Sequence, residues 1–460
     1  MTLIKPISGI RGTIGGKPGE NLCPPDVVKY TAAYAAWAKE QAGSQKLKSV
    51  VGRDARISGE MVSSIVIATL VGMGCDVVNI GLATTPTTEI AVVEEKAQGG
   101  LILTASHNPK QWNALKLLNS SGEFLNAAEG ERVLQLAEKG EFSFAQVDEL
   151  GRVSKKDYLP VHIKKITELE LVDKKAIEAA GFKVAVDAVN SVGGIAVPAL
   201  LKALGVVDVV EINCEATGDF AHTPEPVPEN LAETSEIIRN SQVDVGFVVD
   251  PDVDRLVVIN EDGSMFNEEY TLVAVADYVL KSTPGNTVSN LSSSRALRDV
   301  TDMHGQSYAA AAVGEVNVVA KMKETGAVIG GEGNGGVIYP ASHYGRDALA
   351  GAALFLSHLA QSGLKCSELR KTYPDYFISK NKIELAAGID VDVLLNRLRE
   401  KYKKEQITDI DGVKIDFPES WVHLRKSNTE PIIRIYAEAR TEAGAARLAQ
   451  EIMNDIRSLL

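Results

Sequence analysis

The chain has 460 residues, of which 45% are hydrophobic and 24% are charged, and its formal net charge is −13. At about 150 residues per domain this length predicts roughly three domains, and so ordinary a composition argues against a disordered chain. No apolar run approaches the roughly 18 residues that span a bilayer, and the acidic charge argues against nucleic-acid binding, which needs a basic face.

The start of the chain and its cysteines indicate the compartment. The segment MTLIKPISGIRG lacks the charged start, long apolar core and small-residue cleavage site of a secretory signal. The cysteines are far apart and include no CxxC pair, which argues against a zinc site or a disulfide framework. We therefore expect a cytoplasmic protein with reduced thiols that binds a small molecule and neither nucleic acid nor membrane.

From the N-terminus onward, short apolar runs alternate with helical patterns, which predicts sheets of parallel strands flanked by helices. Three segments repeat the order of strand, polar loop, helix, glycine stop and next strand. Their predicted strands are 49–54, 183–190 and 286–294, and helices follow from about residues 58, 194 and 296. The fold class expected is therefore α/β, with three similar modules in tandem.

The last part of the chain breaks this rhythm. Segments 380–386, 413–417, 420–427 and 431–439 are strand-like, with helical patterns at about 391–404 and from about 441. This order predicts a smaller α+β domain with an antiparallel sheet. Weakly periodic stretches near 151–156, 261–263 and 373–375 are the expected joints, which gives domains 1–152, 153–261, 262–373 and 374–460.

The segment TASHNP follows the apolar run GGLIL and places Ser106 where a strand ends. A serine at that position indicates an exposed nucleophile, which can attack phosphorus or can carry a phosphate group for transfer. His107 and Lys116 are nearby candidates for proton handling and charge stabilisation. The same residues also fit a capped turn, because Ser and Asn favour turns and Pro ends helices.

A second apolar run, VGFVVD, ends in DPDVDR, in which Asp250, Asp252 and Asp254 alternate. Three such carboxylates form an oxygen cage for a divalent ion. An EF-hand loop needs glycine where Arg255 stands, and its flanks would be helices rather than strands. A haloacid-dehalogenase-type phosphatase wants Thr or Val in place of the third aspartate. A catalytic magnesium loop fits best, with Arg255 as a second cation, and the alternative is a solvated acidic turn.

Two later segments are candidates for substrate contacts. In RKSNTEPIIR, Arg425 and Arg434 flank a stretch rich in hydroxyl and amide groups, which suits a two-point phosphate clamp. A capped helix or a hairpin turn is the alternative. In GEGNGG, Glu332 and Asn334 offer hydrogen bonds to sugar hydroxyls. That segment is neither a Walker loop nor a dinucleotide fingerprint.

Cations inside such loops are expected where an acidic protein binds anions. The loops contain Arg53, Arg56, Arg255, Arg425, Lys426 and Arg434. The alternative for any one of them is an ordinary solvated surface charge.

These four blocks, in this order, resemble the α-D-phosphohexomutase family over nearly the whole chain. The resemblance implies four domains with mixed sheets around a central cleft, and a phosphoserine at Ser106. It implies a magnesium site, a sugar loop and a phosphate loop. These expectations fall on Ser106, Asp250, Asp252 and Asp254 for magnesium, on Glu332 and Asn334 for the sugar, and on Arg425, Ser427, Asn428, Thr429 and Arg434 for the phosphate.

Two further segments, SGIRG and GRDARISG, resemble family segments that bring Arg11 and Arg53 toward the site. Asn113 and Lys116 match the Asn and Lys that follow the family serine loop. The mechanism implied is phosphate transfer from Ser106 to a hexose phosphate, reorientation of a bound 1,6-bisphosphate, and return of its other phosphate to the serine. Lys116, His107 and Arg11 are the candidate acids and bases, with Lys116 first.

The sugar loop departs from the pattern GExSGH of many members, because Asn334 and Gly336 replace its Ser and its final His. The form GEGNGG looks more like archaeal-type mutases of more than one hexose, which leaves the substrate open. We favour glucosamine phosphate, because a hexosamine ammonium would suit Glu332 and Asn334 as neighbours, with glucose or mannose phosphate as the alternative. A metal-dependent sugar phosphatase and a non-catalytic sugar-phosphate-binding protein are the remaining alternatives. We expect a monomer or a homodimer.

Overall fold

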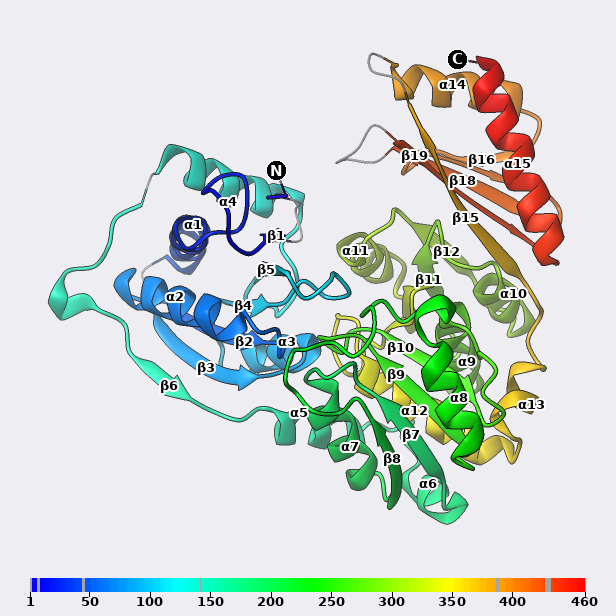
Figure 1. Cartoon of the computed structure of the whole chain (residues 1–460), viewed down its shortest axis with the longest axis horizontal. Helices are drawn as coiled ribbons and strands as arrows, with labels where there is room; N and C mark the ends of the chain where they lie inside the picture. Colours follow the sequence, from blue (N-terminus) through cyan, green and yellow to red (C-terminus); the bar gives the residue numbers. More distant parts are fainter. Residues whose placement is uncertain are drawn as a thin grey trace. The chain divides into compact units, whose positions relative to one another are not determined.

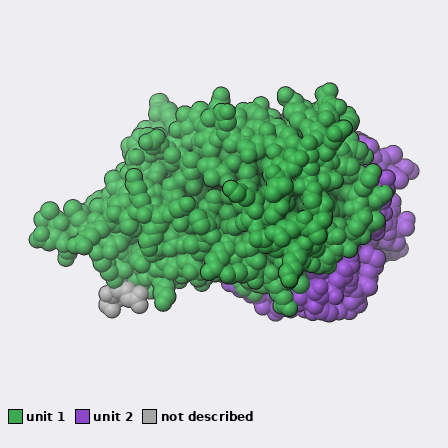
Figure 2. All heavy atoms as spheres, turned by 90° about the horizontal axis from the view of Figure 1, so that it is seen from below, with its two compact units in different colours: residues 1–271, 334–370 green, residues 272–333, 371–460 purple. Residues whose placement is uncertain are grey.

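The structure is a computed structural model of the chain, and it describes residues 2–5, 9–43, 46–140, 142–385, 389–426 and 432–459. The chain forms two compact units, coloured separately in Figure 2. The first contains residues 1–271 and 334–370, and the second contains residues 272–333 and 371–460. Among the described residues, no helix combines the length and the apolar character that crossing a membrane requires.

The first unit begins with a six-stranded mixed sheet in the order β1-β5-β4-β2-β3-β6 (Figure 1). Strand β5 is antiparallel to β1 and β4, whereas β4, β2, β3 and β6 run parallel. The strands are β1 (Ile10–Thr13), β2 (Lys48–Arg53), β3 (Asp76–Leu82), β4 (Gly99–Leu103), β5 (Trp112–Leu118) and β6 (Val153–Lys155), and the helices are α1 (Pro24–Ala42), α2 (Gly59–Gly72), α3 (Thr85–Glu94) and α4 (Ala127–Lys139), with the short helix η1 (Val147–Glu149).

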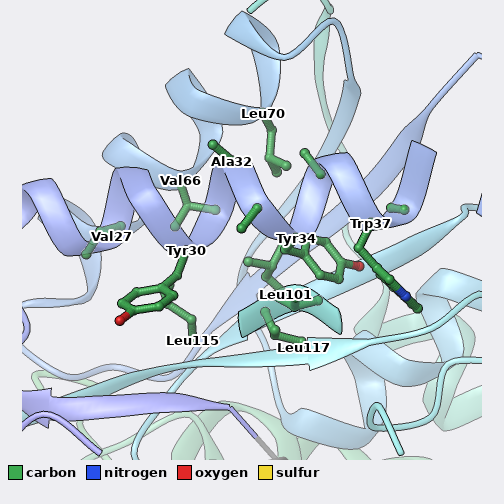
Figure 3. Close-up of a cluster of buried hydrophobic side chains, with 14 of the residues drawn as sticks. Val27, Tyr30, Ala32, Tyr34, Trp37, Val66, Leu70, Leu101, Leu115 and Leu117 are labelled. Carbon is green, nitrogen blue, oxygen red and sulfur yellow. The ribbon is translucent and has the colours of Figure 1, made fainter. Parts of the chain in front are cut away.

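Helix α1 packs its aromatic residues onto this sheet (Figure 3). Tyr34 and Trp37 are almost fully buried, together with Leu101 of β4 and Leu117 of β5. The hydroxyl of Tyr34 donates a hydrogen bond to the carbonyl of Leu118 at 2.7 Å, so its buried polar group is satisfied. Aromatic side chains of this size dominate the hydrophobic stabilisation of a core, and this core fixes β4, the strand that leads to Ser106.

A second mixed sheet in the first unit has the order β10-β9-β7-β8. Strands β9 and β10 form an antiparallel pair, and β7 is parallel to both β8 and β9. The elements are β7 (Lys183–Asp187), β8 (Asp208–Ile212), β9 (Val245–Val249), β10 (Leu256–Asn260), α5 (Leu159–Thr167), α6 (Lys174–Ala180), α7 (Gly193–Ala203), η2 (Pro228–Asn230) and α8 (Ala232–Asn240).

Residues 334–370 also pack in the first unit. They supply β14 (Gly336–Ile338), α12 (Ala348–Ser362) and α13 (Cys366–Arg370). Helix α12 contacts α5, α6 and α7, and its Phe355 makes edge-to-face contacts with Phe247 of β9 and with Phe266. Helix α9 (Glu268–Ser282) begins in the first unit and ends in the second.

The second unit contains a parallel β arrangement and the C-terminal domain. Strand β11 (Thr287–Asn290) is parallel to β12 (Tyr308–Ala311) and to β13 (Ile329–Glu332), with helices α10 (Ala296–Met303) and α11 (Glu315–Thr325). The C-terminal sheet is antiparallel in the order β15-β19-β18-β17-β16. Its elements are β15 (Phe377–Glu384), α14 (Val391–Lys401), β16 (Gln406–Thr408), β17 (Val413–Asp416), β18 (Trp421–Lys426), β19 (Ile432–Ala439) and α15 (Glu442–Leu459).

The predicted order of elements is confirmed. The three module-opening strands are β2, β7 and β11, and the helices that follow them are α2, α7 and α10. The C-terminal antiparallel sheet is also confirmed, with the addition of β16, which the sequence did not predict. All four cysteines are free thiols in the structure.

Candidate active site

Ser106 lies in the loop that follows β4. Its backbone φ is +48°, a left-handed conformation that residues other than glycine seldom adopt. This conformation directs the hydroxyl toward the aspartate loop, where Oγ donates to Oδ2 of Asp250 at 2.8 Å. The sequence predicted an exposed hydroxyl, and that is wrong for this structure, because Ser106 is only 8% exposed. The side chain therefore has little contact with solvent.

Arg56 holds the serine loop in place. Its guanidinium donates to the carbonyls of Ser106, Asn108, Pro109 and Trp112, and its fifth N–H donates to Asp54 at 2.9 Å. The side chain is fully buried. The prediction that it serves as a cation for the substrate is therefore wrong, because all five donors already bind the protein.

Asp54 completes this frame. It accepts a hydrogen bond from Oγ1 of Thr104 at 2.6 Å, and Thr104 in turn accepts from the N–H of Ser106 at 2.9 Å. Burial raises the pKa of the Asp54 carboxyl, although the neighbouring Arg56 charge opposes that rise. The segment GRDAR therefore builds the support of the serine loop.

The aspartate loop connects β9 to β10 and gathers three fully buried carboxylates. Asp250, Asp252 and Asp254 offer oxygens that lie within 4.8 Å of one another. Oδ1 of Asp250 accepts hydrogen bonds from the N–H groups of Asp254 and Arg255, each at 3.2 Å. Val253 has a φ of +62°, which is a strained conformation for a β-branched residue. The sharp turn that brings the carboxylates together therefore requires local backbone strain.

Three cations surround these carboxylates. Nζ of Lys116 lies 2.7 Å from Oδ2 of Asp252, and Arg346 donates to Oδ2 of Asp254 at 2.6 Å. Nε of Arg255 lies 3.9 Å from carboxylate oxygens of Asp250 and Asp254. Burial and the charges of Asp254 and Asp252 raise the pKa of Asp250 well above its usual range. Burial opposes protonation of Lys116, but the charges of Asp252 and Asp254 outweigh it and raise the Lys116 pKa.

The donor set fits a magnesium ion. Oδ1 of Asp252 and Oδ1 of Asp254 are buried and make no hydrogen bond among the described residues. A buried carboxylate oxygen without such a partner is costly. Carboxylate oxygens are also the ligands that Mg²⁺ prefers. The ion would be held by these two oxygens together with the side chains of Asp250 and the adjoining Ser106.

His107 and Arg11 lie in the same region of charge. Nδ1 of His107 is 3.4 Å from Oγ of Ser106. Burial, together with the charges of Arg255, Arg11 and Arg346, lowers the pKa of His107 to about 2, so the imidazole is neutral at ordinary pH. Burial and the nearby Arg255 also lower the pKa of Arg11. The structure therefore brings Arg11, on β1, into the electrostatic neighbourhood of the serine.

Three supporting residues could not be predicted from the sequence. Oγ1 of Thr85 donates to Asp252 at 2.6 Å. The hydroxyl of Ser191 donates to the carbonyl of Pro251 at 2.7 Å and accepts from the N–H of Ala55 at 3.3 Å, so it joins the aspartate loop to the segment GRDAR. Arg346 is the third. Ser191 is 60 residues from its partner Pro251, and Thr85 is 167 residues from its partner Asp252. Contacts between residues so far apart in the chain leave no local sequence pattern.

The predicted sugar loop contributes residues to both compact units. Glu332 ends β13 in the second unit, where its carboxylate accepts from Asn290 at 2.8 Å and from the N–H of Gly314 at 3.1 Å. Asn334 belongs to the first unit, where its Oδ1 accepts from the N–H of Gly336 at 3.2 Å. The geometry of each residue is therefore set within its own unit.

The predicted phosphate clamp lies in the C-terminal sheet. Arg425 of β18 and Arg434 of β19 are direct cross-strand partners. Nε of Arg425 also lies 2.9 Å from Oδ2 of Asp411. The remaining predicted members, Ser427, Asn428 and Thr429, lie outside the described residues.

Two other predicted residues have local partners. Arg53 donates to the carbonyl of Asp54 at 3.1 Å, and its side chain lies against Gly59. Asn113 is fully buried and donates to the hydroxyl of Ser58 at 2.9 Å. Both contacts support the loop that follows β2.

Comparison with known protein families matches nearly the whole chain. Four family models match in chain order, described as the α/β/α domains I, II and III and the C-terminal domain of phosphoglucomutase/phosphomannomutase. They cover residues 5–144, 160–263, 267–376 and 383–455. The fold therefore has three α/β domains and a C-terminal domain with an antiparallel sheet.

Curated relatives cover almost the full length. A phosphoglucomutase/phosphomannomutase of Thermococcus kodakarensis is 36% identical over 94% of this chain and 95% of its own length. A probable phosphoglucosamine mutase of Methanopyrus kandleri is 32% identical, with 98% and 97% covered. A phosphoglucosamine/phosphogalactosamine mutase of Sulfurisphaera tokodaii is 30% identical, with 96% and 97% covered.

Solved structures agree with these relatives. A phosphoglucomutase/phosphomannomutase family protein of Burkholderia thailandensis superposes with a TM-score of 0.84 at 25% identity, covering 98% of this chain and 96% of that chain. A putative phosphomannomutase of Thermus thermophilus has the same TM-score and identity, with 99% of each chain covered. With four domain models in order and relatives above 30% identity over the full length, the chain belongs to the phosphoglucomutase/phosphomannomutase family, the α-D-phosphohexomutases, which are enzymes of intramolecular phosphoryl transfer.

Proposed function

We propose that this enzyme interconverts hexose 6-phosphate and hexose 1-phosphate through a phosphorylated Ser106 and a bound hexose 1,6-bisphosphate, and that glucosamine phosphate is its preferred substrate. It acts in the cytoplasm as a monomer or a homodimer. The main support for this proposal is the 2.8 Å hydrogen bond from Oγ of Ser106 to Asp250. Ser106 makes this bond from a left-handed backbone conformation.

The reaction consists of two phosphoryl transfers. In the first, the bond between phosphorus and Oγ of Ser106 breaks, a bond from phosphorus to the free sugar hydroxyl forms, and the hydroxyl proton leaves to a base. The bisphosphate then turns end for end. In the second, Oγ of Ser106 attacks the other phosphate, and the sugar oxygen that is released takes a proton.

Cations around the serine lower the barrier to this transfer. The transition state places negative charge on the transferring phosphoryl oxygens, and positive groups fixed in a water-excluded site stabilise that charge. Lys116, Arg255 and Arg346 are the cations of this chain at the site. A magnesium ion held by Asp250, Asp252 and Asp254 would supply further charge neutralisation when bound.

We assign proton transfer to residues at the serine and at the adjoining carboxylate cluster. Lys116 is the first candidate, because its ammonium lies 2.7 Å from Asp252 at the edge of the carboxylate cluster. His107, 3.4 Å from Oγ of Ser106, is the second, and Arg11 is the third. A general acid or base must reach the reacting oxygen within hydrogen-bond distance or through one water.

The distal phosphate is assigned to the C-terminal sheet. Residues directly opposite on antiparallel strands have Cβ atoms roughly 5 Å apart, and like charges in that position destabilise a sheet. Arg425 and Arg434 are such a pair. A bound phosphate would relieve their repulsion through planar two-point contacts, and Ser427, Asn428 and Thr429 would add hydroxyl and amide donors.

The choice of sugar is assigned to Glu332 and Asn334. A carboxylate or an amide would favour the ammonium group of a hexosamine, and two of the relatives carry a phosphoglucosamine mutase name. The second candidate function is phosphoglucomutase or phosphomannomutase activity by the same mechanism. The relative of 36% identity, which is named for that activity, favours it.

Intact-mass spectrometry tests the phosphoserine. The resting enzyme should carry the mass of one phosphate, and Ser106→Ala should remove that mass together with mutase activity. Ser64→Ala is the matched control, because Ser64 is exposed on α2 and donates only to the carbonyl of Glu60, and it should keep both. A phosphate that survives in Ser106→Ala overturns the role of Ser106.

A competition assay tests the reaction and the sugar. Enzyme with magnesium and a trace of hexose 1,6-bisphosphate is offered glucosamine, glucose and mannose 6-phosphates, and each 1-phosphate is quantified. A higher kcat/KM for glucosamine 6-phosphate supports the proposal, whereas comparable values overturn the glucosamine preference. Release of inorganic phosphate without isomerisation would indicate the phosphatase, and no turnover would indicate the binding protein.

A further inference from the structure

A second cluster of possible metal ligands is buried in the first unit, formed by His162, His343 and Asp347. Nε2 of His162 lies 2.9 Å from Oδ2 of Asp347, and Nε2 of His343 lies 3.3 Å from the same oxygen. In a tetrahedral zinc site with bonds of about 2.0–2.1 Å, neighbouring ligand atoms are about 3.3 Å apart. The distance from His343 matches this spacing and that from His162 is shorter, and without an ion both are hydrogen-bonding distances.

The far side of each ligand is also fixed. Nδ1 of His162 lies 2.9 Å from Oγ1 of Thr87, and Nδ1 of His343 lies 3.3 Å from Oε2 of Glu89. Oδ1 of Asp347 accepts hydrogen bonds from two N–H groups at the start of α12. Metal-binding histidines almost always use their second nitrogen in this way, which fixes the ring orientation and the tautomer.

The ligands come from segments far apart in the chain. His162 is in α5, His343 precedes α12, and Asp347 is the N-cap of α12. The side chains of His162 and Asp347 are buried, at 0% and 1% exposure, whereas that of His343 is 12% exposed. Of the three side chains, that of His343 is therefore the most accessible to solvent.

From this geometry we propose that His162, His343 and Asp347 bind a divalent transition-metal ion, for which Zn²⁺ is the best fit. Imidazole nitrogens with one carboxylate favour zinc and similar ions, whereas magnesium prefers an all-oxygen set. Three protein ligands are the number that zinc takes when a solvent molecule completes its coordination. The wide cysteine spacing predicted no zinc site, but this site contains no cysteine, so that spacing could not reveal it.

The ion would brace the fold rather than take part in phosphoryl transfer, and the proposal does not depend on the proposed function. It would tie α5 to the start of α12 and, through Thr87 and Glu89, to α3. Thr85 at the start of α3 is hydrogen-bonded to Asp252. The zinc site therefore lies next to the support of the aspartate loop without sharing a ligand with it.

Zinc content in the presence of excess magnesium tests the proposal. Full-length enzyme is stripped with a chelator, dialysed against equimolar zinc with magnesium in large excess, and measured by elemental mass spectrometry. The wild type should retain one zinc per chain, and its melting temperature should rise on loading. His343→Gln and His162→Gln should each lose the zinc and the rise. A wild type that retains no zinc overturns the proposal.

Three further variants separate this site from its neighbours. His358→Gln, in the same helix α12 but outside the cluster, and Asp252→Asn, in the aspartate loop, should both keep the zinc. Loss of zinc in Asp252→Asn, or its retention in both His343→Gln and His162→Gln, overturns the assignment. Glu89→Gln leaves the ligands intact and should weaken zinc binding about 10- to 100-fold. It thus provides a test even where a ligand variant fails to fold, and unchanged affinity there contradicts the proposal. The visible spectrum of a cobalt-substituted sample should report nitrogen ligation.

Discussion

At the residue scale, Arg56 shows how one buried side chain can fix a loop, here the loop that contains Ser106. Lysine keeps the charge but offers three donors instead of five, so Arg56→Lys leaves loop carbonyls without partners. Each unsatisfied buried group costs about 1–3 kcal/mol. We expect Arg56→Lys to lower the free energy of unfolding by on the order of 3 kcal/mol and kcat by roughly 100-fold, the effect of displacing a reacting group by about 1 Å. Denaturant unfolding and steady-state kinetics measure the two quantities.

The matched control is Arg53→Lys. Arg53 lies three residues earlier, is only partly buried, and donates one hydrogen bond among the described residues, to the carbonyl of Asp54. Its replacement should change stability by no more than about 0.5 kcal/mol. Equal effects of the two substitutions would show that the serine loop does not depend on the Arg56 guanidinium.

Thr85 is the second residue whose role follows from one contact. Its hydroxyl donates to Oδ2 of Asp252 at 2.6 Å, and groups that orient a metal-binding carboxylate typically contribute 10- to 100-fold to metal affinity. Thr85→Val keeps the shape and removes the donor. We therefore expect the magnesium concentration for half-maximal activity to rise at least about tenfold, measured by titration of the chelator-treated enzyme.

Thr88→Val is the control for that substitution. Thr88 is equally buried on the same helix, but its hydroxyl donates to the carbonyl of Thr84. The magnesium dependence should then stay close to that of the wild type. A parallel shift in both variants would indicate a general disturbance of α3 rather than loss of the Asp252 contact.

The residues proposed to react could be singled out from the sequence, because their signal is local. Ser106 follows an apolar strand directly, and Asp250, Asp252 and Asp254 alternate within five residues. The role of Arg346 could not be predicted, because its partner Asp254 is 92 residues away and their contact depends on how α12 packs. Arg56 shows the same limit in another form, because its place in a polar loop suggests a cation for anion binding and only the fold reveals its five protein acceptors.

At the element scale, the turn between β13 and β14 depends on a glycine. Gly335 has a φ of +87°, and a Cβ there would lie 2.5 Å from the carbonyl oxygen of Leu256. Its own carbonyl accepts from the N–H of Leu256, the first residue of β10. Gly335→Ala should cost about 1–2 kcal/mol for the left-handed conformation alone and more for the close contact, as measured by denaturant unfolding.

Gly140→Ala separates these two costs. Gly140 ends α4 with a φ of +64°, and a Cβ there would meet nothing within 4 Å. It should therefore show the conformational cost alone. If the two alanine variants lose the same stability, the contact with Leu256 relaxes freely and β10 does not depend on it.

Helices and strands could be predicted where a hydrophobic periodicity is bounded by polar or glycine-containing loop residues. Strand β2 and helix α2 are separated by a polar loop, and the predicted helix start at about residue 58 is one residue from its observed start at Gly59. Strand β16 could not, because its three residues, Gln406–Thr408, are too short for an alternating pattern. The antiparallel pairing of β5 with β4 could not be predicted from the sequence either, because the relative direction of two strands depends on tertiary pairing rather than on local sequence.

At the scale of the whole molecule, each compact unit has a hydrophobic core of its own. One core contains Trp37 in the first unit, and another packs α15 on the C-terminal sheet in the second unit, with Ile452 fully buried. Units with separate cores can unfold in separate cooperative steps. The chain has three tryptophans, Trp37, Trp112 and Trp421, so fluorescence can report on each unit.

Truncating Ile452 should therefore affect only one of two transitions. In a Trp37→Phe/Trp112→Phe background the fluorescence reports on Trp421 of the second unit, and in a Trp421→Phe background it reports on the first. Ile452→Ala should lower the stability seen by Trp421 by about 2–5 kcal/mol, the usual cost of such a cavity, and leave the other signal unchanged. Gln450→Ala, exposed on the same helix, should change neither by more than about 0.5 kcal/mol. If Ile452→Ala shifts both signals together, the two units unfold as one, and their separate cores do not define separate cooperative steps.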